Sequence, residues 1–128
     1  INKIMKGKII NKKITFLGVT FKPNTDDMRE SPALKLIPKL NRIGAKITYY
    51  DPSGFKDIFD KYKNVIFTNK ITSACKNSDL IILHTEWNEF RNLNFKKLVG
   101  NKKFSLYDMR NIFSYNKMTK SGINYFRI

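Results

Sequence analysis

The feature that most constrains the fold is a strand, a long polar loop and a helix start that follow one another directly. Ile14–Leu17 is a short apolar run of the kind that forms a buried parallel strand. Residues 18–32 are polar, and the apolar residues of 33–37 then begin a helical pattern. Ser31 is a favoured N-cap residue, and Pro32 suits the first helical position because its missing N–H leaves no bond unmade there. In open α/β sheets such a loop lies at the carboxyl edge, where ligands bind.

Strands and helices alternate along the rest of the chain. Leu80–Leu83 is apolar throughout and is typical of a central strand, whereas the short run 65–67 is expected at an edge. This alternation predicts a single α/β domain with a Rossmann-like, doubly wound, mostly parallel sheet. Pro38 lies inside the first helix, where its missing N–H predicts a kink. Strands are expected at residues 14–17, 45–50, 65–67, 80–83, 104–107 and 123–126, and helices at 32–43, 55–63, 71–77, 96–99 and 115–121.

Composition limits the classes of partner. The chain has 25 Lys and Arg residues against 10 Asp and Glu, a formal charge of +15. Such a charge is compatible with nucleic-acid binding, but the lysines are scattered and no arginine-rich run accompanies them, so most of the charge is interpreted as solvated surface. The single cysteine allows no internal disulfide and gives no metal-binding pattern, which fits a cytoplasmic protein. No apolar run approaches the ~20 residues of a membrane span. The first residue is Ile1 and not methionine, which suggests a piece of a longer protein.

The polar loop carries two cations that could hold an anion. Lys22 stands at the strand exit, and Arg29 stands beside the helix start, whose partial positive charge also favours an anion. This arrangement suits phosphate. Asp26, Asp27 and Glu30 would repel an anion, so we expect these acids to hold the two cations and the amides of the loop in place.

The strand exits should form one site. We expect the first strand to lie beside the fourth at a topological switch point, so that the exits of strands one, four and five share one edge. These exits would bring together Phe21 and Lys22, then residues 85–87, then Asp108 and Arg110. Two cations with aromatic surface suit a nucleotide diphosphate. No G-x-G-x-x-G motif follows the first strand, so the chain is not expected to hold a dinucleotide as its main ligand.

Three separated motifs carry a resemblance to a known family. They are residues 18–34, 85–90 and 108–111. In order and spacing they resemble the C-terminal nucleotide-sugar-binding domain of the UDP-glucose/GDP-mannose dehydrogenase family, and most closely that of UDP-glucose 6-dehydrogenases. The resemblance implies that residues 1–12 are the end of a linker helix from a missing central domain, and that 13–128 form the UDP-sugar-binding domain.

The resemblance also implies roles for individual residues. By it, Phe21 and Lys22 contact the nucleotide sugar, and Arg110 binds it from the fifth strand. Arg29 would reach towards NAD held by a missing N-terminal domain. Met109 departs from the family pattern, in which a glycine is common. The family's catalytic cysteine belongs to a motif of the central domain, so no catalytic residue and no metal ligand are expected in this chain.

The implied activity is NAD-dependent oxidation of UDP-glucose to UDP-glucuronate. It would belong to the intact enzyme, which is expected to be a cytoplasmic homo-oligomer that binds neither nucleic acid nor membrane. This domain alone is expected to be inactive. Two alternatives stay open. The first is a related dehydrogenase whose substrate is a UDP-N-acetylhexosamine or GDP-mannose. The second is not an enzyme: a stand-alone basic nucleic-acid-binding domain, supported by net charge alone.

Several other conspicuous side chains are interpreted as packing residues. Cys75 has no base near it in the sequence, so a nucleophile is not expected there. His84 follows an apolar strand, which favours packing over acid–base catalysis. Trp87 and Phe90 have the spacing of two residues that pack together in the core.

Overall fold

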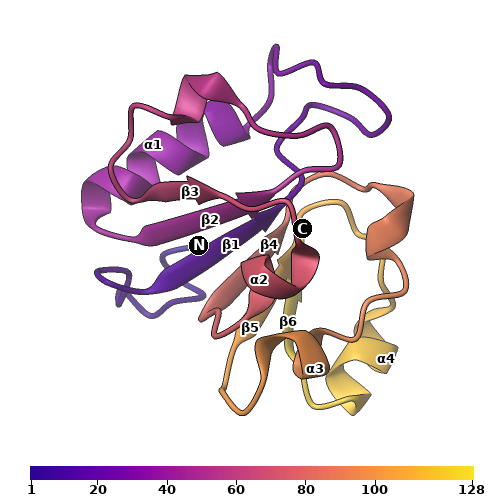
Figure 1. Ribbon diagram of the computed structural model, residues 1–128. Helices are drawn as coiled ribbons and strands as arrows, with labels where there is room; N and C mark the ends of the chain where they lie inside the picture. Colours follow the sequence, from indigo (N-terminus) through magenta and orange to yellow (C-terminus); the bar gives the residue numbers. More distant parts are fainter.

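The computed structural model describes residues 1–128 as a single six-stranded sheet in which all neighbouring strands are parallel (Figure 1). This confirms the predicted α/β class and the parallel sheet. The strands are β1 (Lys13–Leu17), β2 (Lys46–Tyr50), β3 (Val65–Phe67), β4 (Leu80–Leu83), β5 (Ser105–Asp108) and β6 (Asn124–Arg127). The helices are α1 (Ala33–Ile43), α2 (Ile71–Cys75), α3 (Phe95–Val99) and α4 (Tyr115–Lys120), with single 3-10 turns η1 (Asp57–Phe59) and η2 (Asn88–Phe90).

The strand order is β3-β2-β1-β4-β5-β6. From β1 the chain builds outwards to β2 and β3, returns to β4 beside β1, and then builds outwards on the other side. The order therefore reverses between β1 and β4, as predicted, and the short β3 lies at an edge. Ligands of doubly wound sheets bind outside the carboxyl ends of the strands at such a reversal.

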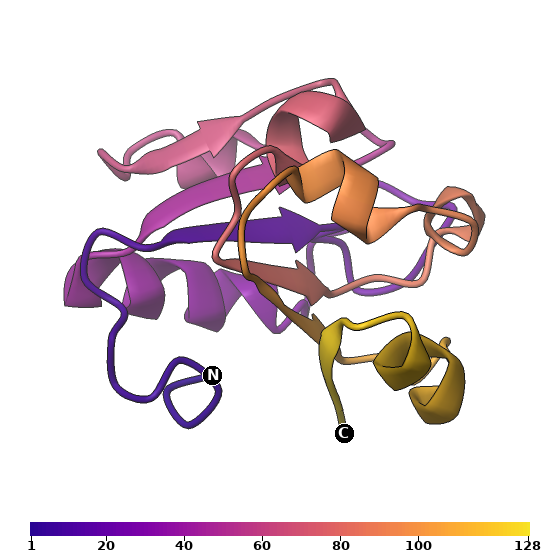
Figure 2. The ribbon, with the colours of Figure 1, turned by 90° about the horizontal axis from the view of Figure 1, so that it is seen from below.

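Apolar side chains alternate between two cores, one on each face of the sheet. In β4, Leu80 and Ile82 belong to the core that includes Ile37 of α1, whereas Ile81 and Leu83 belong to the core that includes Phe95 of α3. Figure 2 shows α1 on one face and α2 with α3 on the other. Because a central strand is buried on both faces, β4 needs apolar residues at every position.

Helix α1 begins and ends as its sequence predicts. The Ser31 hydroxyl accepts a hydrogen bond from Ala33 N–H at 3.2 Å, which satisfies one of the free amides of the first turn. Gly44 ends the helix with φ 111°, and its N–H reaches the carbonyls of Leu40 and Asn41. The helix continues past Pro38, so the proline does not end it, and the kink expected there stays a prediction.

Two expected helices are absent. Residues 1–12 contain turns and no helix, so the expected helical linker end is wrong as a local structure. Lys6 and Gly7 have φ values of 53° and 75°, which an α-helix does not accommodate. Residues 55–63 form only the turn η1, because the Tyr49 hydroxyl accepts a hydrogen bond from Lys56 N–H at 2.9 Å and holds the chain there. None of the helices has the length and apolar character needed to cross a bilayer.

Candidate functional site

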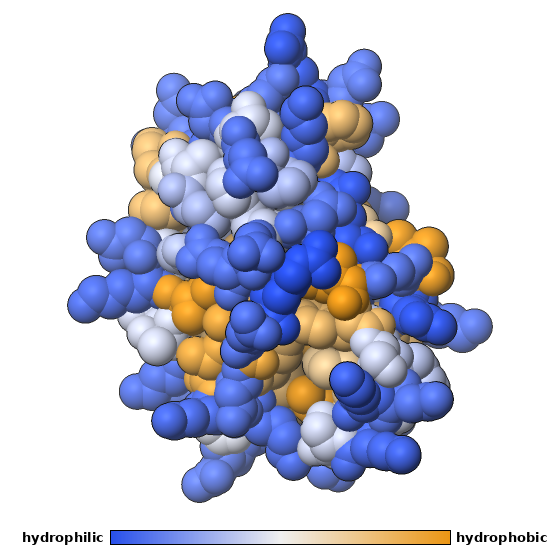
Figure 3. All heavy atoms as spheres, turned by 90° about the vertical axis from the view of Figure 1, so that its right-hand side faces the viewer, coloured by the Kyte–Doolittle hydropathy of each residue, from blue (hydrophilic) through white to orange (hydrophobic).

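The exits of β1, β4 and β5 are joined by one side chain, Arg110. Its Nε donates to the carbonyl oxygen of His84 at 2.6 Å, and a terminal nitrogen donates to the carbonyl oxygen of Phe21 at 3.0 Å. His84 follows β4 and Phe21 follows β1. The predicted meeting of the three exits at one edge is therefore confirmed. Figure 3 views the right-hand side of Figure 1, where the strand arrowheads point, and shows apolar side chains in the middle of this face, surrounded by hydrophilic ones.

Asp108 fixes the backbone from which Arg110 projects. Its carboxylate is fully buried at the end of β5 and accepts hydrogen bonds from the N–H of Arg110 at 2.9 Å, Ile112 at 2.9 Å and Phe113 at 3.1 Å. The Tyr125 hydroxyl of β6 donates to the same carboxylate at 2.7 Å. Burial and this neighbouring carboxylate raise the pKa of Tyr125, so its hydroxyl stays protonated and remains a donor. A buried carboxylate needs several donors, and here those donors order the loop that carries Arg110.

The two carbonyl bonds use only part of the donor set of Arg110. A guanidinium presents further N–H groups in the same plane, which suit the paired oxygens of a phosphate. The side chain is half-buried, so it is fixed in position and still partly accessible. Its geometry therefore suits recognition of an anion at this edge.

The loop after β1 adds Phe21 and Lys22. Phe21 is 45% exposed, so its aromatic side chain is accessible to a base or sugar. Lys22 is exposed, and its ammonium group makes no hydrogen bond or ion pair within the chain. The loop is anchored below them, where Val19 N–H donates to the Asp51 carboxylate at 2.8 Å and Ser31 donates to the Val19 carbonyl at 2.5 Å.

Arg29 makes its side-chain bonds elsewhere. It pairs with Asp27 through two parallel contacts, Nε to Oδ1 at 3.0 Å and a terminal nitrogen to Oδ2 at 3.0 Å. The hydrogen bonds from Arg29 lower the pKa of the Asp27 carboxyl to about 2. The expectation that an acid of this loop holds a cation is confirmed for Asp27. Arg29 is exposed and is not hydrogen-bonded to Arg110 or Phe21.

A second link between the exits of β1 and β4 is the buried Thr85 hydroxyl, which also contacts the imidazole of His84. The Thr85 hydroxyl donates to the Thr20 carbonyl at 2.7 Å and lies 3.0 Å from His84 Nδ1. Because the hydroxyl proton is used, Nδ1 must be the donor in that pair, which leaves the buried Nε2 as an acceptor with no partner. Burial and then the charge of Arg110 lower the pKa of His84 to about 3, so the imidazole is neutral.

Gly18 is required by this link. Its φ of +79° is in the left-handed region, and a Cβ placed there would lie 2.6 Å from Thr85 Cβ. The space that a glycine leaves at a strand exit is therefore filled by a side chain of the same domain, and it is closed to a ligand's pyrophosphate.

The remaining candidates lie in or against the apolar cores. Cys75 is buried in the core that includes Phe95, and burial raises the pKa of its thiol to about 12, so it is not a nucleophile. His84 is fully buried, Phe90 is in the same core as Cys75, and Trp87 packs against that core. No group of three or more His, Cys, Asp or Glu side chains is placed to hold a metal ion.

Asp51 and Asp108 hold the loops of the site in a way that the sequence motifs do not predict. Each carboxylate stands at the end of a strand: Asp51 directly follows Tyr50, the last residue of β2, and Asp108 is the last residue of β5. Both are buried and accept backbone N–H bonds from loops at the site. A carboxylate at a strand end followed by a polar loop is the signal that could have indicated them.

Comparison with known proteins identifies the family. The family model described as "UDP-glucose/GDP-mannose dehydrogenase family, UDP binding domain" matches residues 15–115. The chain is 40% identical over 120 residues to a UDP-glucose 6-dehydrogenase of Rhizobium meliloti, covering 93% of this chain and 28% of that protein. It is 33% identical over 128 residues to that of Rickettsia felis, covering 98% of this chain and 29% of the relative. The chain thus spans less than a third of the length of these relatives.

Solved structures agree with the fold. An NDP-N-acetyl-D-galactosaminuronic acid dehydrogenase from Methanosarcina mazei matches with a TM-score of 0.82 and 20% identity, over 99% of this chain and 26% of the other. The UDP-N-acetyl-mannosamine dehydrogenase Cap5O from S. aureus matches with a TM-score of 0.72 and 25% identity, over 98% and 28%. With its parallel sheet, its arginine-bridged strand exits and the family match over most of its length, the chain belongs to the UDP-glucose/GDP-mannose dehydrogenase family and comprises its UDP-binding domain.

Proposed function

We propose that this chain is the substrate-binding domain of an NAD-dependent UDP-glucose 6-dehydrogenase, which oxidises UDP-glucose to UDP-glucuronate. The observation that carries the proposal is Arg110, held by the carbonyls of His84 and Phe21 at the sheet reversal, beside the unpaired Lys22. The curated relatives at 40% and 33% identity bear this enzyme's name, which supports UDP-glucose as the sugar.

In this proposal the nucleotide is recognised by its charge and by its base. The ammonium of Lys22 and the remaining N–H groups of Arg110 bind the diphosphate, because charge-assisted hydrogen bonds to phosphate are the strong ones. The exposed ring of Phe21 contacts the uracil or the ribose. These residues bind and orient the substrate, and no residue of the chain is assigned to the oxidation itself.

NAD would be held mainly outside these residues. When bound, NAD accepts a hydride from the alcohol being oxidised. The residues after β1 do not fit a dinucleotide pyrophosphate, because Thr85 fills the space beside Gly18 and no further glycine follows. The contribution proposed for this chain is limited to Arg29, which would exchange Asp27 for a phosphate of NAD held by the rest of the enzyme. We further propose that the enzyme is a cytoplasmic homo-oligomer.

A UDP-N-acetylhexosamine is the second candidate substrate. It is favoured by the likeness to the S. aureus UDP-N-acetyl-mannosamine dehydrogenase, at 25% identity over 98% of this chain. The residues assigned here contact the nucleotide and not the sugar, so both candidates use the same site. Turnover of UDP-glucose and of UDP-N-acetylmannosamine by the intact enzyme distinguishes them.

Calorimetric titration of the chain with UDP, uridine and inorganic phosphate tests the nucleotide site. UDP should bind more tightly than uridine or phosphate, because both the diphosphate and the base are recognised. Equal binding of UDP and phosphate, together with steeply salt-dependent binding to any duplex DNA, would instead support the basic nucleic-acid-binding alternative.

The substitution Lys22→Ala should weaken UDP binding by roughly tenfold, the effect of losing one charge-assisted hydrogen bond of ~1.5 kcal/mol. Lys61→Ala and Lys117→Ala remove the same charge from exposed positions away from the strand exits and should change the UDP affinity by less than about twofold. Arg29→Ala should also leave UDP binding unchanged. A similar loss in all four variants would mean that diffuse charge binds UDP, and it would contradict the proposed site.

A further inference from the structure

A second basic site lies at the opposite edge of the sheet. A groove of about 730 Å³ is lined by 14 residues from the segment before β1, the residue before β4, α3, the turn before β5 with the first residue of that strand, and the start of β6. Because all strands are parallel, these residues mark the amino edge, whereas Arg110 is at the carboxyl edge. The groove is therefore not part of the site described above.

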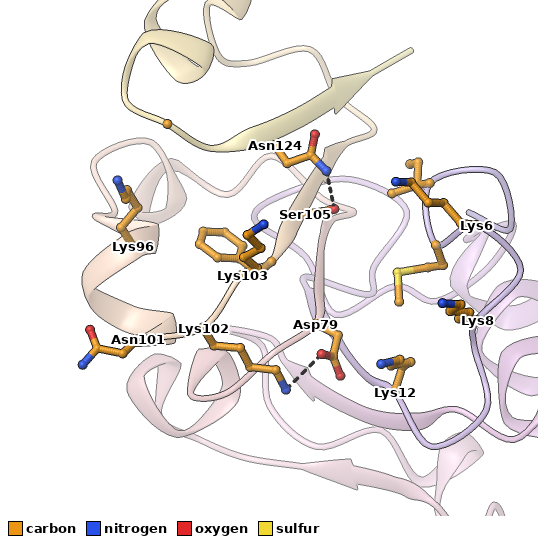
Figure 4. Close-up of a pocket in the computed structure, with 14 residues that line it drawn as sticks. Lys6, Lys8, Lys12, Asp79, Lys96, Asn101, Lys102, Lys103, Ser105 and Asn124 are labelled. Carbon is orange, nitrogen blue, oxygen red and sulfur yellow. Dashed lines mark hydrogen bonds and ion pairs between the residues drawn. The ribbon is translucent and has the colours of Figure 1, made fainter.

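The lining of the groove is strongly cationic. Six of its 14 residues are lysines. Figure 4 shows them on two facing walls: Lys6, Lys8 and Lys12 come from the segment before β1, and Lys96, Lys102 and Lys103 come from α3 and the turn before β5.

The single carboxylate of the groove is already engaged. Asp79 pairs with Lys102 at 2.9 Å and accepts the backbone N–H of Lys13 at 2.8 Å. No carboxylate is left for the other lysines of the lining.

Four of the lysines are uncompensated, namely Lys6, Lys8, Lys12 and Lys103. None of their ammonium groups makes an ion pair or a hydrogen bond, whereas Lys96 reaches the Ser121 carbonyl at 3.0 Å and Lys102 reaches the Asn77 carbonyl. Like charges that face each other across a concave site repel one another, and solvent screens them only beyond about 10 Å at 0.1 M salt. A ligand with several negative charges would remove this repulsion.

The rest of the lining favours a compact phosphate ligand. Asn124 donates to the Ser105 hydroxyl at 2.9 Å, which leaves the Ser105 proton free to donate to an anion. Ile4, Met5 and Phe104 add a small apolar surface. We propose that this groove binds a short polyphosphate chain, either inorganic or part of a nucleoside polyphosphate, independently of UDP.

The experiment is calorimetric titration of the 128-residue chain with sodium tripolyphosphate, with and without saturating UDP. The variant carries Lys8→Gln and Lys103→Gln, one from each wall and both exposed. The matched control carries Lys35→Gln and Lys39→Gln, two exposed lysines of α1 with the same total change of charge. Thermal midpoints verify that both variants fold.

The groove variant should bind tripolyphosphate about tenfold more weakly, since two charge-assisted contacts are lost, while the control changes by less than about twofold. With saturating UDP on the strand-exit site, tripolyphosphate should still bind to the groove, and UDP should keep its affinity in the groove variant. ATP in place of tripolyphosphate identifies the source: tighter binding of ATP indicates a nucleoside polyphosphate, and equal binding indicates the phosphate chain alone. Equal losses in the groove and control variants, no tripolyphosphate binding in the presence of saturating UDP, or much tighter binding of duplex DNA that depends on the same two lysines would each overturn the proposal. If the wild-type chain binds tripolyphosphate but not UDP, the result would contradict the proposed function and leave the groove proposal standing.

Discussion

Replacing Arg110 with alanine is expected to weaken UDP binding by about a hundredfold, more than any other single change at the strand exits. Loss of a charge-assisted hydrogen bond to phosphate costs ~1.5–3 kcal/mol, and each ~1.4 kcal/mol is a factor of ten in affinity. The upper end of this range applies because the same guanidinium holds the carbonyls of Phe21 and His84, at 3.0 Å and 2.6 Å. Alanine would therefore remove a ligand contact and also release the loop that carries Phe21 and Lys22.

A conservative variant separates these two effects. Lysine at position 110 keeps the positive charge but, as a point charge, cannot span two carbonyls and a phosphate in one plane. Arg110→Lys should accordingly lose about tenfold in UDP affinity, between the wild type and the alanine variant. Arg42→Ala, in the exposed last turn of α1, is the matched control and should change the affinity by less than about twofold.

Calorimetry on the four proteins, with thermal midpoints measured in parallel, gives the result. If Arg110→Ala shifts the midpoint strongly, the lysine variant still reports on the ligand contact. Equal UDP affinities for Arg110→Ala and Arg42→Ala would show that Arg110 does not bind the nucleotide.

Arg110 also shows which features of the site can be predicted from the sequence and which cannot. The alternation of strands and helices predicts the sheet reversal and with it the common edge of the exits. The resemblance predicts Arg110 as a ligand contact, but nothing in the sequence indicates that its guanidinium holds the carbonyls of Phe21 and His84, which are 89 and 26 residues away. Such contacts depend on the relative positions of three loops, which local patterns do not encode.

The same limit explains why the helix expected over residues 55–63 is absent. Their charged and aromatic residues have helical spacing, but the Tyr49 hydroxyl binds both the N–H and the carbonyl of Lys56, and Phe59 packs on the Tyr49 ring at a centroid distance of 5.3 Å. Tertiary contacts thereby override a weak helical propensity. In residues 1–12 the positive φ values at Lys6 and Gly7 are likewise incompatible with the expected helix.

His84 should make the stability of the domain depend on pH in a range where few other groups titrate. It is the only histidine of the chain. Burial, followed by the charge of Arg110, lowers its pKa in the folded state to about 3 from the ordinary 6.5. Between these two values the unfolded chain binds a proton that the folded chain does not, so the free energy of unfolding falls as the pH falls. Above pH 6.5 both states are neutral at this residue and the contribution is constant.

The expected size follows from proton linkage. One proton taken up on unfolding changes the free energy of unfolding by ~1.4 kcal/mol per pH unit, which amounts to about 2 kcal/mol between pH 7 and pH 5. His84→Asn is the matched variant, because its side-chain amide can still donate to the Thr85 hydroxyl while the group no longer titrates. Urea unfolding at several pH values should give a sloping profile for the wild type and a nearly flat one for His84→Asn. Parallel profiles would show that His84 gains its proton as readily in the folded domain as in the unfolded chain, and they would contradict the buried, neutral imidazole beside the Thr85 hydroxyl.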